Sequence, residues 1–181
     1  MGSIEGEPML SGTALRHQMI LPEQQFLYDY WRSKCRNGQL PRREDIDPAD
    51  IYQHLPMISI IEVCAETLVK TDVRRYKYRL AGTGFWDMYE AEITGQYIDE
   101  LPIGCRCDYW HRVLGRIMDK RRPSAGVTKP GTPLRAHLAQ FWIRLPLSED
   151  GVNVSSILGF DHLVKYSEMP QNLSEPQRIS A

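Results

Sequence analysis

The chain has 181 residues, of which 42% are hydrophobic and 25% are charged, and its formal net charge is -1 at pH 7. This length is sufficient for one domain with a substantial core and short tails, and is too small for two domains of ordinary size. The near-neutral charge provides no bulk attraction to nucleic acid or to anionic lipid, so the composition disfavours both as partners.

The chain contains no apolar run of the roughly 18 residues that a membrane-spanning helix requires. Its N-terminus carries Glu5 and Glu7 and lacks the basic and apolar regions of a secretion signal. Its four cysteines belong to a chain with an ample core, which favours reduced thiols over a disulfide framework. We therefore expect a cytoplasmic protein.

The N-terminal part of the chain predicts an arm followed by a helix. Residues 1–20 are expected to form a flexible arm, because the segment begins with small and polar residues that show no hydrophobic periodicity. Residues 23–36 are expected to form a helix, since Pro22 suits a first helical turn and Asn37-Gly38 suits a helix end.

One face of this helix carries a broad apolar stripe that must pack against something. Its members are Phe26, Leu27, Tyr30, Trp31 and Cys35. Two partners remain open: the sheet of the same chain, or the same helix of a second subunit. The second alternative makes Phe26, Leu27, Tyr30 and Trp31 a surface for a homodimer or another protein partner.

The next segments predict a capped turn and two paired strands. Asp47-Pro48-Ala49-Asp50 has the composition of an N-cap and first helical turn. Residues 56–63 are β-branched and predict a central strand. Residues 65–72 then form a turn into a strand at 75–80, in which Tyr76, Tyr78 and Leu80 alternate with charged residues. The pair is expected to be antiparallel, with these three side chains on the buried face.

Two helices follow, a short one and a longer one. Thr83 is expected to cap the short helix, which carries Phe85, Met88 and Tyr89 on one side. The longer helix spans residues 106–122 and places Trp110 and Leu114 on its apolar arc. Its last turn holds Lys120, Arg121 and Arg122, which we interpret as cations that complement a helix C-terminus.

The last third of the chain predicts three strands and a tail. The strands are expected near residues 125–128, 134–147 and 152–163, with a hairpin turn at 148–151. Residues 166–181 are polar and predict a C-terminal tail. Strands and helices in this order favour an α+β fold with one antiparallel sheet.

The sequence resembles a bacterial PAS-like family in the order and spacing of several segments. These segments are Trp31 and Asp47-Pro48-Ala49-Asp50-Ile51, Tyr78-Arg79-Leu80-Ala81-Gly82-Thr83, Ile93-Thr94-Gly95 with Tyr97-Ile98-Asp99-Glu100-Leu101, and Leu145-Pro146-Leu147-Ser148-Glu149-Asp150-Gly151. The resemblance covers roughly residues 26–164. It implies a five-stranded antiparallel sheet with helices on one face, an additional N-terminal helix, and a domain over residues 21–165. It also implies a sensory or regulatory role with no fixed ligand and usually no catalysis.

The aromatic content of the predicted core is larger than a small α+β domain needs, which suits a largely apolar ligand pocket. Plain core packing explains the same residues, so both interpretations remain open. The candidate pocket residues are Tyr78, Phe85, Trp86, Met88, Tyr89, Trp110, Leu114, Phe141 and Phe160.

No motif in the chain predicts an enzyme. Gly82-Thr83-Gly84 fails as a dinucleotide fingerprint, because Asp87 occupies the position of the third glycine. Cys105, Cys107 and His111 lack the fourth ligand of a structural zinc site. We expect no catalytic residue and no metal site, and the cofactor, if there is one, is not identified.

The resulting hypothesis is non-catalytic signalling, in which a small ligand or a protein partner shifts the packing of helices on the sheet. We expect no kinase, cyclase or DNA-binding module in this single domain, so the signal is expected to pass to a separate protein. One alternative is a haem- or other cofactor-binding protein, or a small enzyme, that uses His111 and Cys107. Another is a structural adaptor with no ligand.

Overall fold

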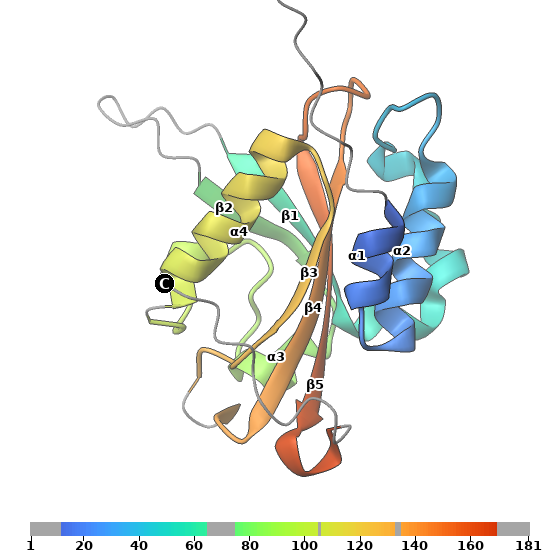
Figure 1. The fold of residues 1–181 in the computed structure, drawn as a ribbon. Coiled ribbons are helices and arrows are strands. Elements are labelled where there is room, and N and C mark those ends of the chain that lie inside the picture. The colour runs from blue at the N-terminus through green and yellow to red at the C-terminus, as the bar shows by residue number, and fades with distance from the viewer. Residues whose placement is uncertain (1–11, 65–74, 105, 133–134, 170–181) are drawn as a thin grey trace, which may run out of the picture.

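The computed structural model describes residues 12–64, 75–104, 106–132 and 135–169, and its centre is one antiparallel sheet (Figure 1). The strand order is β2-β1-β5-β4-β3. The strands are β1 (Ile58–Cys64), β2 (Arg75–Ala81), β3 (Ser124–Thr128), β4 (Leu138–Leu147) and β5 (Ser156–Lys165). The predicted α+β class and five-stranded sheet are therefore confirmed.

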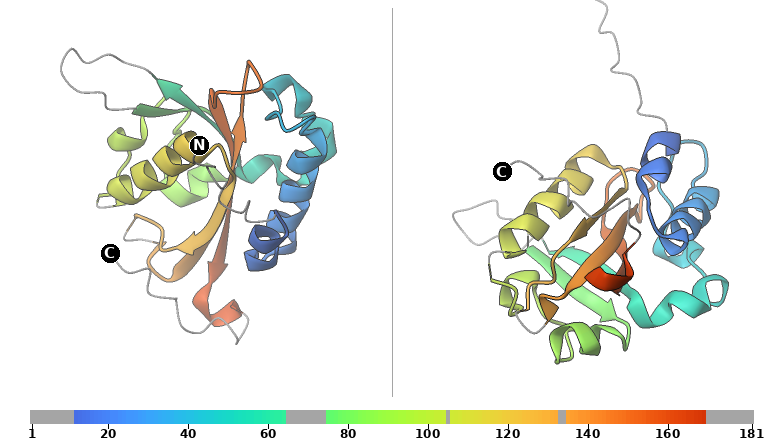
Figure 2. Two further views of the ribbon diagram at one scale, coloured as in Figure 1. Left: turned by 45° about the horizontal axis from the view of Figure 1, so that its top comes forward. Right: turned by 60° about the horizontal axis from the view of Figure 1, so that its bottom comes forward.

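Helices cover both faces of this sheet (Figures 1 and 2). One face carries α3 (Phe85–Tyr89), η3 (Ile98–Glu100) and α4 (Arg106–Lys120), and the opposite face carries α1 (Gly12–Gln18), α2 (Pro22–Lys34) and η2 (Pro48–Met57). Two further 3-10 turns are η1 (Arg43–Asp45) and η5 (Tyr166–Glu168). The sheet is the middle layer, and all ten residues of β4 are buried.

Helix α2 packs against the sheet of its own chain. Its Leu27 and Trp31 are buried, the Trp31 indole Nε1 donates a hydrogen bond to the Pro146 carbonyl at 2.8 Å, and the Gln24 amide donates to the Trp142 carbonyl at 2.8 Å. Leu27 and Trp31 are therefore unavailable to a second subunit, and their place in the predicted dimer surface is wrong. Phe26, at 45% exposure, keeps an outward position.

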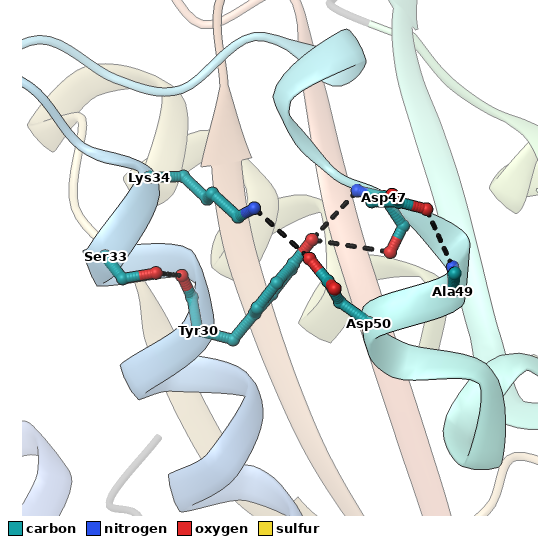
Figure 3. A network of polar contacts seen from close by, with 6 residues as sticks. All are labelled: Tyr30, Ser33, Lys34, Asp47, Ala49 and Asp50. Atoms are coloured by element: carbon teal, nitrogen blue, oxygen red, sulfur yellow. Dashed lines mark hydrogen bonds and ion pairs between the residues drawn. The ribbon is translucent and has the colours of Figure 1, made fainter.

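A polar network ties η2 to α2 (Figure 3). The Tyr30 hydroxyl accepts a hydrogen bond from the Asp47 backbone N–H at 2.8 Å, and Lys34 Nζ lies 3.2 Å from the Asp50 carboxylate. The Asp47 carboxylate accepts from the Ala49 N–H at 2.8 Å, which confirms the predicted N-cap. The network fixes the connector that leads into β1.

Part of the predicted N-terminal arm is folded, because α1 begins at Gly12. The Arg16 guanidinium pairs with the Asp29 carboxylate of α2 at 2.8 Å, and Met19 is buried. These contacts come from α2, so local periodicity could not indicate them. At the other end, β5 reaches Lys165, and the first residues of the predicted tail form the 3-10 turn η5. Residues 1–11 and 170–181 lie outside the described part.

Strand β2 follows the predicted alternation at Tyr76 and Tyr78, which are buried, and departs from it at Leu80, which is 41% exposed. The register moves from Ile60 opposite Leu80 to Ile61 opposite Tyr78. Arg79 is thus an extra residue in a β-bulge, and a bulge interrupts alternation. The predicted turn at 65–72 lies outside the described residues.

The turn before α3 also differs from expectation. Gly84 is the N-cap residue, and Thr83 contributes its backbone carbonyl, which accepts from the Trp86 N–H at 3.2 Å. Gly82 lies so close to η2 that a Cβ atom there would overlap the carbonyls of Leu55 and Pro56. A glycine is required here because η2 and β2 approach backbone to backbone.

Candidate functional site

A charged and aromatic cluster lies on the sheet face beneath α4. Directly paired residues of adjacent strands share a face of the sheet, and Arg144 pairs with Gly159 while Gly159 pairs with Ser59. Asp161, two residues beyond Gly159, faces the same way. The face is the one that α4 covers, because the Arg144 guanidinium lies 4.6 Å from the centre of the Trp110 ring.

The central contact is a buried ion pair. Arg144 Nη2 lies 2.9 Å from an Asp161 carboxylate oxygen, and the two side chains are at most 1% exposed. The Gln140 amide also donates to Asp161 at 2.7 Å. Arg144 Nη1 donates to the carbonyls of Ile143 and Phe160, each at 3.0 Å. The pair is neutral as a whole, and each charge is held by the other and by the sheet.

Arg144 keeps its positive charge. Burial opposes the charged form of Arg144, but the negative charge and hydrogen bonds of Asp161 outweigh this effect and raise the pKa of Arg144 further. Two buried tyrosines, Tyr78 and Tyr89, also belong to this cluster. Burial raises the pKa of Tyr78 to about 12 and holds the pKa of Tyr89 well above its usual value. Both hydroxyls are therefore neutral at pH 7.

Three buried polar atoms of this cluster make no hydrogen bond with a described residue: Ser59 Oγ, Arg144 Nε and Asp161 Oδ2. Asp161 Oδ2 still has its ion-pair contact with Arg144 Nη2, which leaves Ser59 Oγ and Arg144 Nε, both on fully buried side chains. Gly159 makes room for them, because a Cβ atom there would overlap Ser59 Oγ and lie 3.3 Å from Arg144 Nη1. Unused donors in a buried site are costly, so these two atoms are suited to bind a polar group.

Most of the predicted pocket residues surround this cluster. Six are buried residues of β2, α3 and α4: Tyr78, Phe85, Met88, Tyr89, Trp110 and Leu114. The Phe85 and Tyr89 rings are stacked with 6.3 Å between their centres, and Phe85 lies 6.0 Å from Tyr78. These aromatic side chains therefore lie together beside α3, and their role as a pocket lining stays a prediction.

Three of the predicted pocket residues lie elsewhere. Trp86 is 58% exposed on the outer side of α3. Phe160 packs against His54 of η2, with ring centres 5.6 Å apart, and Phe141 shares its face. These three residues are therefore not part of the cluster. For Phe141 and Phe160 the reason is that β4 and most of β5 are buried on both faces, so aromatic content could not indicate which layer a side chain faces.

The sequence analysis missed Arg144, Asp161, Gln140 and Ser59. For two of these residues, Arg144 and Asp161, the sequence pattern does indicate burial. Arg144 is the one charged residue of the β4 sequence LAQFWIRLPL, and Asp161 follows the apolar run ILGF in β5. Charged residues are almost never fully buried unless they are paired. A charged residue within or directly after an apolar run in each of two strands therefore indicates a pair.

The two residues of the alternative site, His111 and Cys107, both lie on α4. The His111 ring packs against Tyr76 with 5.3 Å between ring centres. Burial, with smaller contributions from Asp99 and Asp108, raises the pKa of the Cys107 thiol, so the thiol is a weaker nucleophile and metal ligand. Within the described ranges, no three His, Cys, Asp or Glu side chains gather as metal ligands would; Cys105 lies outside them.

A family model described as a PAS domain matches residues 19–161, which include α2, α3, α4 and nearly the whole sheet. No curated protein matches the chain. None of the helices in the described residues has the length and apolar character of a transmembrane segment.

Proposed function

The chain belongs to the PAS domain family, and we propose that it is a non-catalytic sensory or regulatory domain that binds a small ligand and signals through contact with another protein. The Arg144–Asp161 ion pair beneath α4 is the observation that carries this proposal. Removing two charges from water is costly, and apolar residues of similar volume often fill such a space with equal or greater stability. A role in recognition accounts for the pair better than a role in stability.

The surroundings of the pair suggest how occupancy would be transmitted. Ser59 and Tyr78 come from β1 and β2, Tyr89 from α3, and Trp110 from α4. A ligand group that bonds to Ser59 Oγ or Arg144 Nε must share space with the Trp110 and Tyr89 rings. Its binding therefore favours a packing in which α3 and α4 are displaced on the sheet, and this shift is the signal.

The assembly that we propose is a homodimer with an outer surface on α2 and η2. Phe26 contacts His54 of η2 with 5.2 Å between ring centres, and Tyr52 and Leu55 of η2 are also exposed. Sedimentation of the full chain tests the proposal: Phe26→Asp should dissociate the dimer, whereas Val152→Asp, at an equally exposed apolar residue in the β4–β5 hairpin, should leave it intact. A monomeric wild type contradicts it.

Native mass spectrometry of the freshly purified full chain, with an absorbance spectrum of the same sample, tests ligand binding. The matched variant is Arg144→Met/Asp161→Leu, which removes both charges at once and leaves no unpaired ion. We expect an added small-molecule mass on the wild type and its loss from the folded variant. A bare wild type, or equal occupancy of the two proteins, overturns the ligand role of the cluster.

A further inference from the structure

The outer face of α4 carries a row of cations. Arg112, Arg116 and Lys120 are spaced at i, i+4 and i+8, and Arg121 and Arg122 follow the helix end; all five are exposed. We call these five residues the α4 basic stripe. Because side chains four residues apart are neighbours on a helix surface, the three helical cations form one line about 12 Å long.

The stripe has no carboxylate partner within the described part of the chain. Other cations near α4 do have partners. Arg75 pairs with Asp99 at 2.9 Å and with Glu100 at 3.3 Å. The acidic side chains of η3 are thus engaged by β2, and the positive charge of the stripe faces solvent.

The stripe is a local excess of charge. Residues 106–122 contain six Arg or Lys residues and two Asp residues, although the formal net charge of the chain is -1. The rest of the chain is therefore acidic on balance. At physiological salt, charges attract partners over roughly 8 Å, so the stripe acts on a group that docks at α4 and gives little long-range attraction to a large polyanion.

We propose that the α4 basic stripe binds an acidic segment of a protein partner, such as a helix with carboxylates at i and i+4. A membrane is a poorer match, because the exposed positions of α4 are charged and its apolar face is buried against the sheet. A nucleic acid is a poorer match, because the formal net charge of the chain is -1 and offers no bulk attraction to a polyanion.

The position of the stripe connects it with the buried cluster. Trp110, on the inner face of α4, contacts Arg144, and Arg112 and Arg116 lie on the outer face of the same helix. A displacement of α4 on the sheet therefore moves the stripe. This inference deepens the proposed function and rests on it, since it names the chemistry of the partner that receives the signal.

Fluorescence anisotropy of the full chain with a labelled peptide tests the stripe. The peptide is a helical segment of about 14 residues with glutamates at i and i+4, and its glutamine counterpart is the control. Reversing two charges in Arg112→Glu/Arg116→Glu should weaken peptide binding about tenfold or more and flatten its salt dependence. Arg36→Glu/Arg43→Glu changes the net charge equally at exposed positions far from α4 and should change affinity by less than about twofold.

Three results overturn the proposal: no binding of the acidic peptide, equal loss in both double variants, or tighter binding to phosphatidylserine vesicles or a DNA duplex than to the peptide. The last result assigns the stripe to a different partner. The variant Arg144→Met/Asp161→Leu keeps the stripe, so it should still bind the peptide. A failure of ligand binding and a failure of the stripe are therefore separate outcomes.

Discussion

Arg144 of β4 places its guanidinium carbon 4.6 Å from the centre of the Trp110 ring of α4. A desolvated contact between a cation and an indole ring contributes about 2 kcal/mol. This contact links the buried ion pair to the helix whose outer face carries the basic stripe. It therefore connects the two halves of the proposed mechanism, a buried recognition group and an exposed contact surface.

Removing one partner of the ion pair should lower the free energy of unfolding much more than removing both partners. Asp161→Asn leaves the Arg144 charge buried without a counter-ion, and we expect it to lower the free energy of unfolding by about 3–5 kcal/mol. Arg144→Met/Asp161→Leu should lie within about 1–2 kcal/mol of the wild type, since no charge remains buried. Denaturant unfolding measures both. A double variant that is less stable than Asp161→Asn would show that the pair is itself a main source of stability.

The alkaline pH dependence of stability should report the buried tyrosines. The pKa of Tyr78 rises from 10.0 to about 12 on folding, and that of Tyr89 also rises, because burial disfavours the phenolate. Their contribution is fully present below pH 10 and is lost as the pH rises toward 12, since the unfolded chain releases these protons first.

Thermal unfolding across this pH window tests the tyrosine prediction. Tyr78→Phe should make the decline in stability shallower, because one proton release is removed. Tyr52→Phe changes an exposed hydroxyl and should leave the slope as it is in the wild type. A slope that is the same in all three proteins would contradict a role for Tyr78.

Trp31 should stabilise the fold of the single chain. Trp31→Phe keeps most of the ring but leaves the Pro146 carbonyl without its 2.8 Å donor, which should cost about 1–3 kcal/mol. Phe26→Ala, on the exposed side of α2, should cost less than about 1 kcal/mol. Denaturant unfolding of the two variants at several protein concentrations separates packing within one chain from packing between chains.

Two glycines should respond oppositely to alanine. Gly159→Ala should lower stability by about 1–3 kcal/mol because its Cβ overlaps Ser59 Oγ. Gly115→Ala should raise stability by about 0.5–1 kcal/mol, since the nearest heavy atom to its Cβ, the Tyr76 hydroxyl oxygen, is 3.7 Å away and alanine favours a helix.

The second-site substitution Ser59→Gly, added to Gly159→Ala, should recover part of the lost stability, because the two residues are in contact and their effects are not additive. Additive effects of these two substitutions in denaturant unfolding would mean that the crowding lies elsewhere.

Local chemistry was enough to predict most elements. The alternation at Tyr76 and Tyr78, the Asp47 cap and the apolar arc around Trp110 each depend on neighbours within a few residues, and the structure confirms them. The ends of elements were less certain, as at α1 and η5, because contacts from other elements decide where a helix begins or a strand stops.

The sequence by itself determined the fold class and most of the aromatic residues beneath α3 and α4, because hydrophobic periodicity is a local property of the chain. Only the tertiary structure decided which face of β4 meets α4, since every residue of that strand is buried. It also brought Arg144 to Asp161 across two strands and Trp31 to Pro146 across 115 positions. A buried charge is stable only with a partner that the whole fold supplies, so the centre of the candidate site became visible only in three dimensions.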